Sequence, residues 1–157
     1  MFRPPLLMSA LLLPLRAVES PDRAQVVGVV QKFLDALAAR DAVTLQALML
    51  PGTQITSARP VPEGLSVRRR VAEDDAKRLP TGSDRLLERM WNPTVLIQGR
   101  IATVWTPYDF HTNGTFSHSG IDVFILLKTA EGWRIAGLAY TVEPEVPSAH
   151  PAGAPKP

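Results

Sequence analysis

The segment 91–140, WNPTVLIQGRIATVWTPYDFHTNGTFSHSGIDVFILLKTAEGWRIAGLAY, decides the fold. It is rich in β-branched and aromatic residues, which favour strands, and glycine-containing turns divide it. The sequence therefore predicts strands at 94–98, 101–110, 115–129 and 133–142. Asn113-Gly114 is a strong hairpin signal because both turn positions tolerate a positive φ. Since the connections are short, we expect neighbouring strands to pair antiparallel.

Strand 115–129 carries two chemically active groups on one of its faces. Successive strand residues point to opposite sides, so His118 and Asp122 share a face with Phe116 and Phe124. Towards its end the strand is apolar on both sides, which predicts that both faces are covered there.

Pro107 interrupts strand 101–110. Proline has no N–H to donate to a strand ladder, and it is therefore found at sheet edges and at bulges. A bulge at Pro107 would reset the alternation of side chains. Trp105 and Tyr108 would then point to the same side of the sheet.

The first half of the chain predicts helices followed by a hairpin. Ser20-Pro21-Asp22 has the pattern of a helix start, and apolar residues recur after it at helical spacing. Asp41 is a candidate N-cap for a second helix that ends before Pro51-Gly52. The order expected after it is a hairpin (53–58 and 65–71, with a long connection at 59–64), a short helix (73–79) and a less certain strand (85–91). The inward stripe of the first helix is Val26, Val30, Phe33, Leu34 and Leu37.

Length and composition exclude several classes of protein. A chain of 157 residues suits one domain with a real core. It has no cysteine, which excludes thiol catalysis and cysteine-ligated metals. The net charge of +2 is too small to indicate nucleic acid as a partner. The run Arg68-Arg69-Arg70 is followed by Glu73, Asp74 and Asp75, so local neutralisation is the expected role of these charges.

The two ends of the chain differ from the central domain. Met1-Phe2-Arg3 and the apolar run 6–15 predict that residues 1–20 form a signal peptide or a disordered leader. The run is too short to span a bilayer, so we expect no stable membrane anchor. The location expected is periplasmic or secreted, with the cytoplasm as the alternative. Residues 145–157 are rich in proline and alanine and predict a disordered tail.

Four motifs resemble the nuclear transport factor 2-like superfamily, and within it the SnoaL-like or lumazine-binding-like bacterial branch. They are W-N-P-T-V, I-A-T-V-W-T-P-Y-D-F, H-S-G-I-D-V-F and G-W-R-I. The resemblance implies an α+β cone over residues 21–144, in which a bent, mostly antiparallel sheet wraps the N-terminal helices. It further implies a pocket between helix and sheet and a homodimer. Ser119 stands where this branch often has cysteine.

His118, Asp122 and Glu88 are the candidate catalytic residues. His118 and Asp122 are about 13 Å apart along a strand, so any direct partner must come from a neighbouring strand. In the catalytic interpretation His118 shuttles a proton, and Asp122 or Glu88 is a base whose pKa is raised by apolar walls. In the structural interpretation His118 bonds a carbonyl or Glu88, while Asp122 ties the sheet to a helix.

Trp105, Tyr108, Phe110 and Phe116 are candidates for an aromatic wall that binds a ligand, and core packing is the alternative. Tyr108 would orient a substrate. His111 and His118 lack metal-ligand spacing, and no nucleotide or phosphate motif is present, so we expect no metal and no cofactor.

Three functions remain open from the sequence. The first is a pocket protein that binds a small apolar or amphipathic molecule as a dimer. The second is a cofactor-independent lyase, isomerase or hydrolase that uses His118 with Asp122 or Glu88. The third is a protein-interaction accessory module.

Overall fold

The structure, a computed structural model, describes residues 21–143 and 150–153. The predicted leader and most of the predicted tail therefore lie outside the described residues. Within these described ranges, three α-helices and a short 3-10 turn accompany seven strands. The helices are α1 (Pro21–Ala39), α2 (Ala42–Leu48), α3 (Ala72–Arg78) and η1 (Leu79–Thr81). The strands are β1 (Met49–Val61), β2 (Gly64–Val71), β3 (Leu86–Met90), β4 (Thr94–Gln98), β5 (Ile101–Thr112), β6 (Thr115–Thr129) and β7 (Gly132–Thr141).

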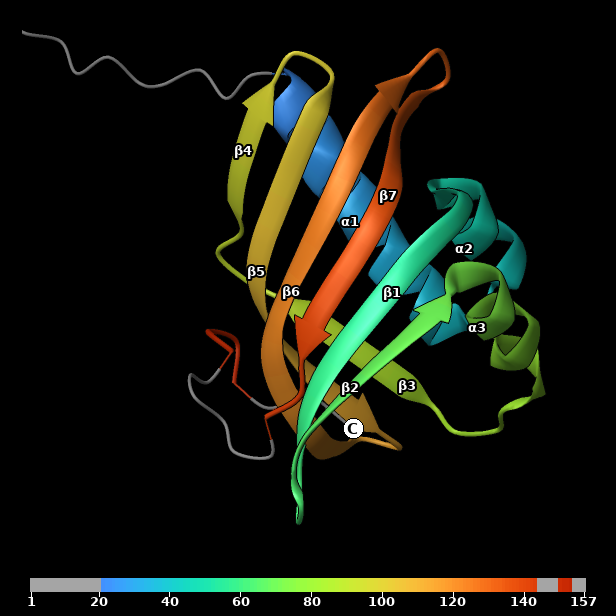
Figure 1. The fold of residues 1–157 in the computed structure, drawn as a ribbon, viewed down its shortest axis with the longest axis vertical. Coiled ribbons are helices and arrows are strands. Elements are labelled where there is room, and N and C mark those ends of the chain that lie inside the picture. Colours follow the sequence, from blue (N-terminus) through green and yellow to red (C-terminus); the bar gives the residue numbers. More distant parts are fainter. Residues whose placement is uncertain (1–20, 144–149, 154–157) are drawn as a thin grey trace, which may run out of the picture.

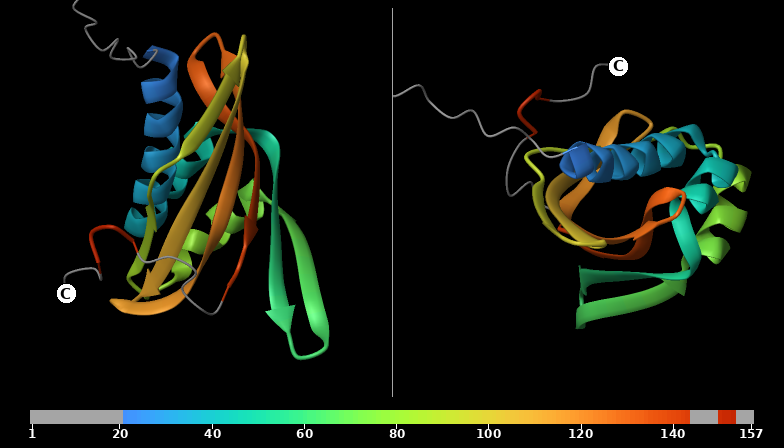
Figure 2. Two further views of the ribbon diagram at one scale, coloured as in Figure 1. Left: turned by 90° about the vertical axis from the view of Figure 1, so that its left-hand side faces the viewer. Right: turned by 90° about the horizontal axis from the view of Figure 1, so that it is seen from above.

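All seven strands belong to one curved sheet, which runs in the order β2-β1-β7-β6-β5-β3 (Figure 1). β4 follows β3 along the same side of β5. Every pairing is antiparallel except that of β1 with β7, which is parallel. Seen from above in Figure 2, the sheet curls round α1, while α2 and α3 lie at one end. The predicted α+β class with a bent, mostly antiparallel sheet is confirmed.

The predicted order of elements is confirmed, with two changes at the first hairpin. Asp41 caps α2 by accepting a hydrogen bond from the Thr44 amide, and the helix ends at Leu48. The next strand then begins before Pro51-Gly52 rather than after it. The long connection expected at 59–64 is wrong, because β1 and β2 remain paired as far as Val61 and Gly64. The hairpin therefore forms a long arm that projects beyond its neighbours (Figure 1).

The prediction of a bulge at Pro107 is wrong. Pairing with β6 is regular through Pro107, which lies opposite Ile121. The carbonyl of Pro107 accepts from Trp91, which lies between the end of β3 and the start of β4. The N–H and C=O of one strand residue point to the same side of the strand. The nitrogen of Pro107, which has no hydrogen, therefore also faces the segment between β3 and β4, where β5 has no paired strand. No ladder bond with β6 is lost, and alternation continues unchanged.

The bulge lies in β6 instead. Phe110 is opposite His118, but the next residue, His111, is opposite Phe116, so Ser117 is the extra residue. A bulge of this kind resets the alternation of side chains along its strand. Phe116 consequently contacts His111, with ring centroids 5.8 Å apart, and does not continue the face of His118.

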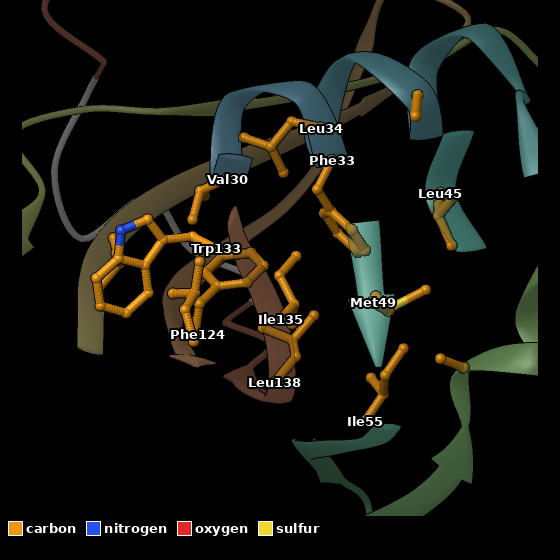
Figure 3. Packing of buried hydrophobic residues seen from close by; sticks show 14 of the residues in the cluster. Val30, Phe33, Leu34, Leu45, Met49, Ile55, Phe124, Trp133, Ile135 and Leu138 are labelled. Carbon is orange, nitrogen blue, oxygen red and sulfur yellow. The ribbon is translucent and has the colours of Figure 1, made fainter. Parts of the chain in front are cut away.

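α1 provides the apolar layer that fills the concave face of the sheet. The predicted stripe of α1 is confirmed in its main part: Val26, Val30, Phe33 and Leu34 are buried. Phe33 packs edge-on against Phe124 with ring centroids 5.5 Å apart (Figure 3). The core extends to the base of β1 through Met49 and Ile55 and to β7 through Trp133, Ile135 and Leu138 (Figure 3).

The convex face of the sheet is open, so the prediction that both faces of β6 are covered is wrong for this chain. Ile125 and Leu127 are 43% and 38% exposed. Leu127 is opposite the exposed Ile101 of β5, and Thr103 separates Ile125 from the exposed Leu96 of β4. Among the described elements the helices lie on the concave side, and no second layer covers this face (Figure 2).

Residues 150–153 lie against β3 and the residue that follows it. The ring of His150 packs edge-on against Trp91 at 5.2 Å, and Arg89 donates to the carbonyl of Gly153 at 2.9 Å. In the part of the chain that the structure describes, no helix has the length and apolarity needed to cross a membrane.

Candidate functional site

A cavity of about 170 Å³ lies between the second half of α1 and the concave face of the sheet. Its volume is close to that of an apolar cavity of about 150 Å³ that holds benzene, so it has room for one small ring. Apolar walls and a few polar groups converge there, as in most ligand sites. It is lined by Phe33, Leu37, Arg59, Glu88, Tyr108, Phe110, His118, Asp122, Leu138 and Tyr140.

Two carboxyl groups meet in this cavity. Glu88 comes from β3 and Asp122 from β6, and their side chains are hydrogen-bonded to each other. Such a bond requires a proton between the two carboxyl groups, because an ionised carboxylate only accepts. Asp122 is 2% exposed, and its buried Oδ2 has no hydrogen-bond partner. Asp122 is therefore buried and incompletely hydrogen-bonded, and Glu88 is half-buried beside it.

The electrostatics of the pair favour the protonated form. Burial raises the pKa of Glu88 to about 7, opposed by the hydrogen bond from Asp122 and assisted by the charge of Asp109. Burial also raises the pKa of Asp122 well above its ordinary value, and the charge and hydrogen bond of Glu88 raise it further. Two ionised carboxylates within hydrogen-bonding distance would repel each other strongly, because the cavity solvates charge poorly. The pair therefore holds a proton near neutral pH.

His118 lies on the same cavity wall, held between aromatic rings. It stacks on Phe110 at 5.0 Å and meets the edge of Tyr108 at 5.9 Å. Its Nδ1 is 3.0 Å from the Ser117 hydroxyl. Burial lowers the pKa of His118, and the positive charge of Arg59 lowers it further. The imidazole is therefore neutral at pH 7, and it can both donate and accept a hydrogen bond.

Tyr108 fills the centre of the cavity floor opposite Gly120. Its hydroxyl donates to the carbonyl of Thr141 at 2.7 Å. This carbonyl approaches Gly120 so closely that a Cβ there would lie 2.2 Å from it. Burial raises the pKa of Tyr108, and the charges of Asp122 and Glu88 raise it further, so the phenol remains protonated.

A second tyrosine, Tyr140, connects the cavity to the arm and to α3. Its ring meets that of Tyr108 edge-on at 6.3 Å. Its hydroxyl accepts a hydrogen bond from Arg70 at 2.9 Å, and the same guanidinium is paired with Asp75 of α3. Arg70 is thus neutralised, as the sequence predicts for the arginine run.

The structure brings together five of the predicted site residues and separates two. Glu88, Tyr108, Phe110, His118 and Asp122 all line the cavity. Trp105 is 44% exposed on the convex face, because regular alternation through Pro107 puts Trp105 and Tyr108 on different faces of the sheet. Phe116 is turned away by the bulge at Ser117.

The contacts that the structural interpretation predicts for His118 and Asp122 are not present in the structure. Asp122 contacts Glu88 of β3, not a helix, and His118 contacts Ser117 instead of a carbonyl or Glu88. His111 lies away from His118, where its Nε2 is 3.4 Å from Asp109. Among the described residues, no group of three metal-ligating side chains forms a site.

The sequence does not predict Arg59 and Tyr140 as parts of the site. Arg59 falls in the expected loop at 59–64, and only the full length of the hairpin shows that it lies in β1 and lines the cavity. Tyr140 reaches the cavity because β7 pairs with β6, with Tyr140 opposite Asp122. Phe33 and Leu37 had been predicted as core residues of α1, and they also form its apolar wall.

Comparison with solved structures defines the fold. A cystatin-like protein of unknown function from Nostoc punctiforme is 12% identical, with a TM-score of 0.63 over 82% of this chain and 96% of that one. An NTF2-like protein from Cytophaga hutchinsonii is 14% identical, with a TM-score of 0.64 over 76% and 97%. An NTF2-like superfamily protein from Salmonella enterica is 16% identical, with a TM-score of 0.62 over 82% and 96%.

The chain therefore has the cystatin-like α+β fold of the NTF2-like proteins, which confirms the predicted resemblance at the level of the fold. No profile of a known protein family matches the sequence, and no curated protein does. Because one fold of this kind hosts unrelated activities, function has to be argued from the site.

Proposed function

We propose that this protein binds a small molecule in the cavity and transfers a proton to or from it, without a cofactor. The observation that carries the proposal is the buried, hydrogen-bonded Glu88–Asp122 pair, whose Asp122 Oδ2 has no protein partner. Titratable groups with perturbed pKa values that converge in one cavity are typical of acid–base sites.

The cavity residues would have three roles in this reaction: proton transfer, hydrogen bonding to the ligand and exclusion of water. The carboxyl pair gives or takes the proton, because a pKa of about 7 lets Glu88 serve as either acid or base near neutral pH. Neutral His118 is positioned to hydrogen-bond a polar group of the ligand. Phe33, Leu37 and Phe110 exclude water, and this strengthens each polar contact inside the cavity.

Deuterium incorporation tests the proposal. Small ring-sized carbonyl compounds are first screened for binding by ligand-detected NMR, and binders are incubated with the protein in D₂O. We expect exchange at a carbon next to the carbonyl, and we expect Glu88→Gln and Asp122→Asn each to slow it by about 100-fold or more. Glu63→Gln, in the turn between β1 and β2, is the matched control and should leave the rate unchanged.

The result also separates catalysis from simple binding. Binding without exchange, unaffected by Glu88→Gln, would leave a binding protein and refute the proton transfer. Absence of binding across the panel would refute both parts of the proposal.

We further propose that two copies associate through the convex face of the sheet. The supporting observation is an uncharged, apolar group of residues that we call the convex patch. Apolar side chains can pack against the same side chains of a second copy, as the symmetric interface of a homodimer requires. The convex patch consists of Leu96, Ile101, Trp105, Ile125 and Leu127, which are exposed on three adjacent strands.

Sedimentation measures this association. The wild-type protein is expected to sediment as a dimer, and the double variant Trp105→Glu and Ile125→Lys as a monomer. Val43→Glu, at an exposed apolar residue of α2, is the control and should remain dimeric. A wild-type monomer at high micromolar concentration would refute the proposed interface.

A further inference from the structure

One charged side chain of the cavity has no role in the proton transfer. Arg59 belongs to β1, in the projecting arm formed by β1 and β2 (Figure 1). Its side chain is exposed and lines the cavity. Its positive charge reaches far enough to lower the pKa of both His118 and Tyr108. Among the described residues no hydrogen bond or salt bridge is recorded for it, whereas the nearby Arg70 is held by both Asp75 and Tyr140.

The register of the arm aims this arginine at the cavity. Ile55 and Ser57 are buried on the concave side of β1, and Arg59 is the next residue with the same orientation. Thr56, opposite Arg69 of β2, belongs to the other face. The sequence thus places one arginine over the cavity mouth and another on the back of the same arm.

A second polar group of the cavity, the side chain of Asp122, is incompletely hydrogen-bonded. Asp122 Oδ2 is buried and unpartnered, and such an atom costs free energy until a donor or acceptor reaches it. Arg59 is exposed and Asp122 is buried, and the apolar side chains Phe33, Leu37 and Leu138 line the same cavity. The cavity therefore has a cationic, exposed mouth, apolar walls around a space with room for one small ring, which we call the waist, and a polar, buried end.

We propose that the ligand is a small organic carboxylate: its carboxylate binds Arg59 at the mouth, its ring-sized apolar body fills the waist, and a hydroxyl or carbonyl group at its far end hydrogen-bonds Asp122. This inference rests on the proposed function of the cavity and names the chemical class of its ligand. A guanidinium is the side chain best shaped to hold a carboxylate, through two parallel N–H donors.

The test compares two probes that differ only in charge, 4-hydroxybenzoate and 4-hydroxybenzamide, titrated into the ¹⁵N-labelled protein and followed by NMR. We expect 4-hydroxybenzoate to shift the amides of the cavity-lining residues and to bind at least tenfold more tightly than the amide. Arg59→Gln should weaken the benzoate about tenfold, because it removes one charged hydrogen-bonding group. Arg69→Gln, with the same change of charge on the back of the arm, should bind as the wild type does.

The outcomes distinguish this inference from the function on which it rests. Equal affinity for the two probes, unchanged by Arg59→Gln, would overturn the carboxylate class and leave a cavity that binds neutral rings. If Arg59→Gln and Arg69→Gln weaken binding of 4-hydroxybenzoate equally, the loss of affinity comes from the lower net charge of the protein. That result would also overturn the inference. Failure of both probes, together with all neutral compounds of the screening panel, to shift any cavity residue would refute the small-molecule site itself.

Discussion

The buried carboxyl pair should make the free energy of unfolding fall as the pH rises from about 4.5 to 7. Burial raises the pKa of folded Glu88 from 4.5 to about 7, while the unfolded chain keeps an ordinary value near 4.3. Below both values each state holds the proton, and the stabilising contribution is fully present. Between them the unfolded chain releases its proton first, so the contribution is lost as the pH approaches 7.

The size of this fall follows from the two pKa values. At 1.36 kcal/mol per unit, a rise from 4.5 to about 7 corresponds to about 3 kcal/mol. The pKa of Asp122 is raised in the same direction and adds to the fall. One group thus changes the stability by a large part of the 5–15 kcal/mol that is roughly typical of a domain.

Urea denaturation followed by tryptophan fluorescence, at pH values from 5 to 8, measures the effect. The double variant Glu88→Gln and Asp122→Asn is the reference, because it keeps the shape of the pair but cannot titrate. Subtracting its free energy of unfolding from that of the wild type removes the contribution of all other groups. A difference that changes by less than about 1 kcal/mol between pH 5 and 8 would refute the assignment of raised pKa values to this pair.

Three further predictions concern a close backbone contact, a buried ion pair and the packing of the core. Gly120→Ala should destabilise the protein by about 1–3 kcal/mol, because its Cβ would lie 2.2 Å from the Thr141 carbonyl oxygen and would disturb the Tyr108 hydrogen bond. Gly137→Ala is the control, since its nearest neighbour would be 3.9 Å away, and an equal fall in melting temperature for both would contradict the argument. Arg89→Ala should cost about 3 kcal/mol in urea denaturation, because it leaves Asp109, 7% exposed, without its paired cation. Replacing both partners, as Arg89→Met with Asp109→Leu, should recover most of this loss, and no recovery would show that the pair is not the cause. Phe124→Ala should cost about 3–5 kcal/mol through the cavity it leaves beside Phe33, whereas Val43→Ala at an exposed position should stay within about 0.5 kcal/mol. A loss below 1 kcal/mol at Phe124 would indicate that the core collapses to fill the space.

The local periodicities of the sequence were sufficient to predict most elements. The apolar stripe of α1 and the Asn113-Gly114 turn depend only on near neighbours, and both are found where expected. The parallel contact between β1 and β7 has no such signal, because it joins segments about 80 residues apart. The position of the bulge was wrong for a related reason. A proline disturbs a sheet only when its nitrogen faces a paired strand. The nitrogen of Pro107 faces the segment between β3 and β4, and the local sequence does not reveal this.

The same distinction applies to the candidate site. Strand alternation was enough to name Glu88 and Asp122 as candidate site residues, but their contact across β5 depends on the curvature of the sheet, which local sequence does not predict. The placement of Phe116 failed because one extra residue, Ser117, reverses the faces beyond it. Arg59 was missed because Pro60 and Pro62 suggested a loop, whereas the strand pairing continues through Pro60 opposite Leu65.

The lateral contact between β1 and β7 sets an order of events for a chain emerging from the ribosome. The first hairpin leaves the exit tunnel with one edge of β1 unpaired, and the strand that will cover this edge is synthesised last among those of the sheet. A nascent chain that stops before Gly132 would have the helices and the two carboxyl residues but no neighbour for that edge. The cavity is therefore complete only when the final strand, which supplies Leu138 and Tyr140, is in place, and a translational pause before it would prolong the exposure of an edge prone to aggregation.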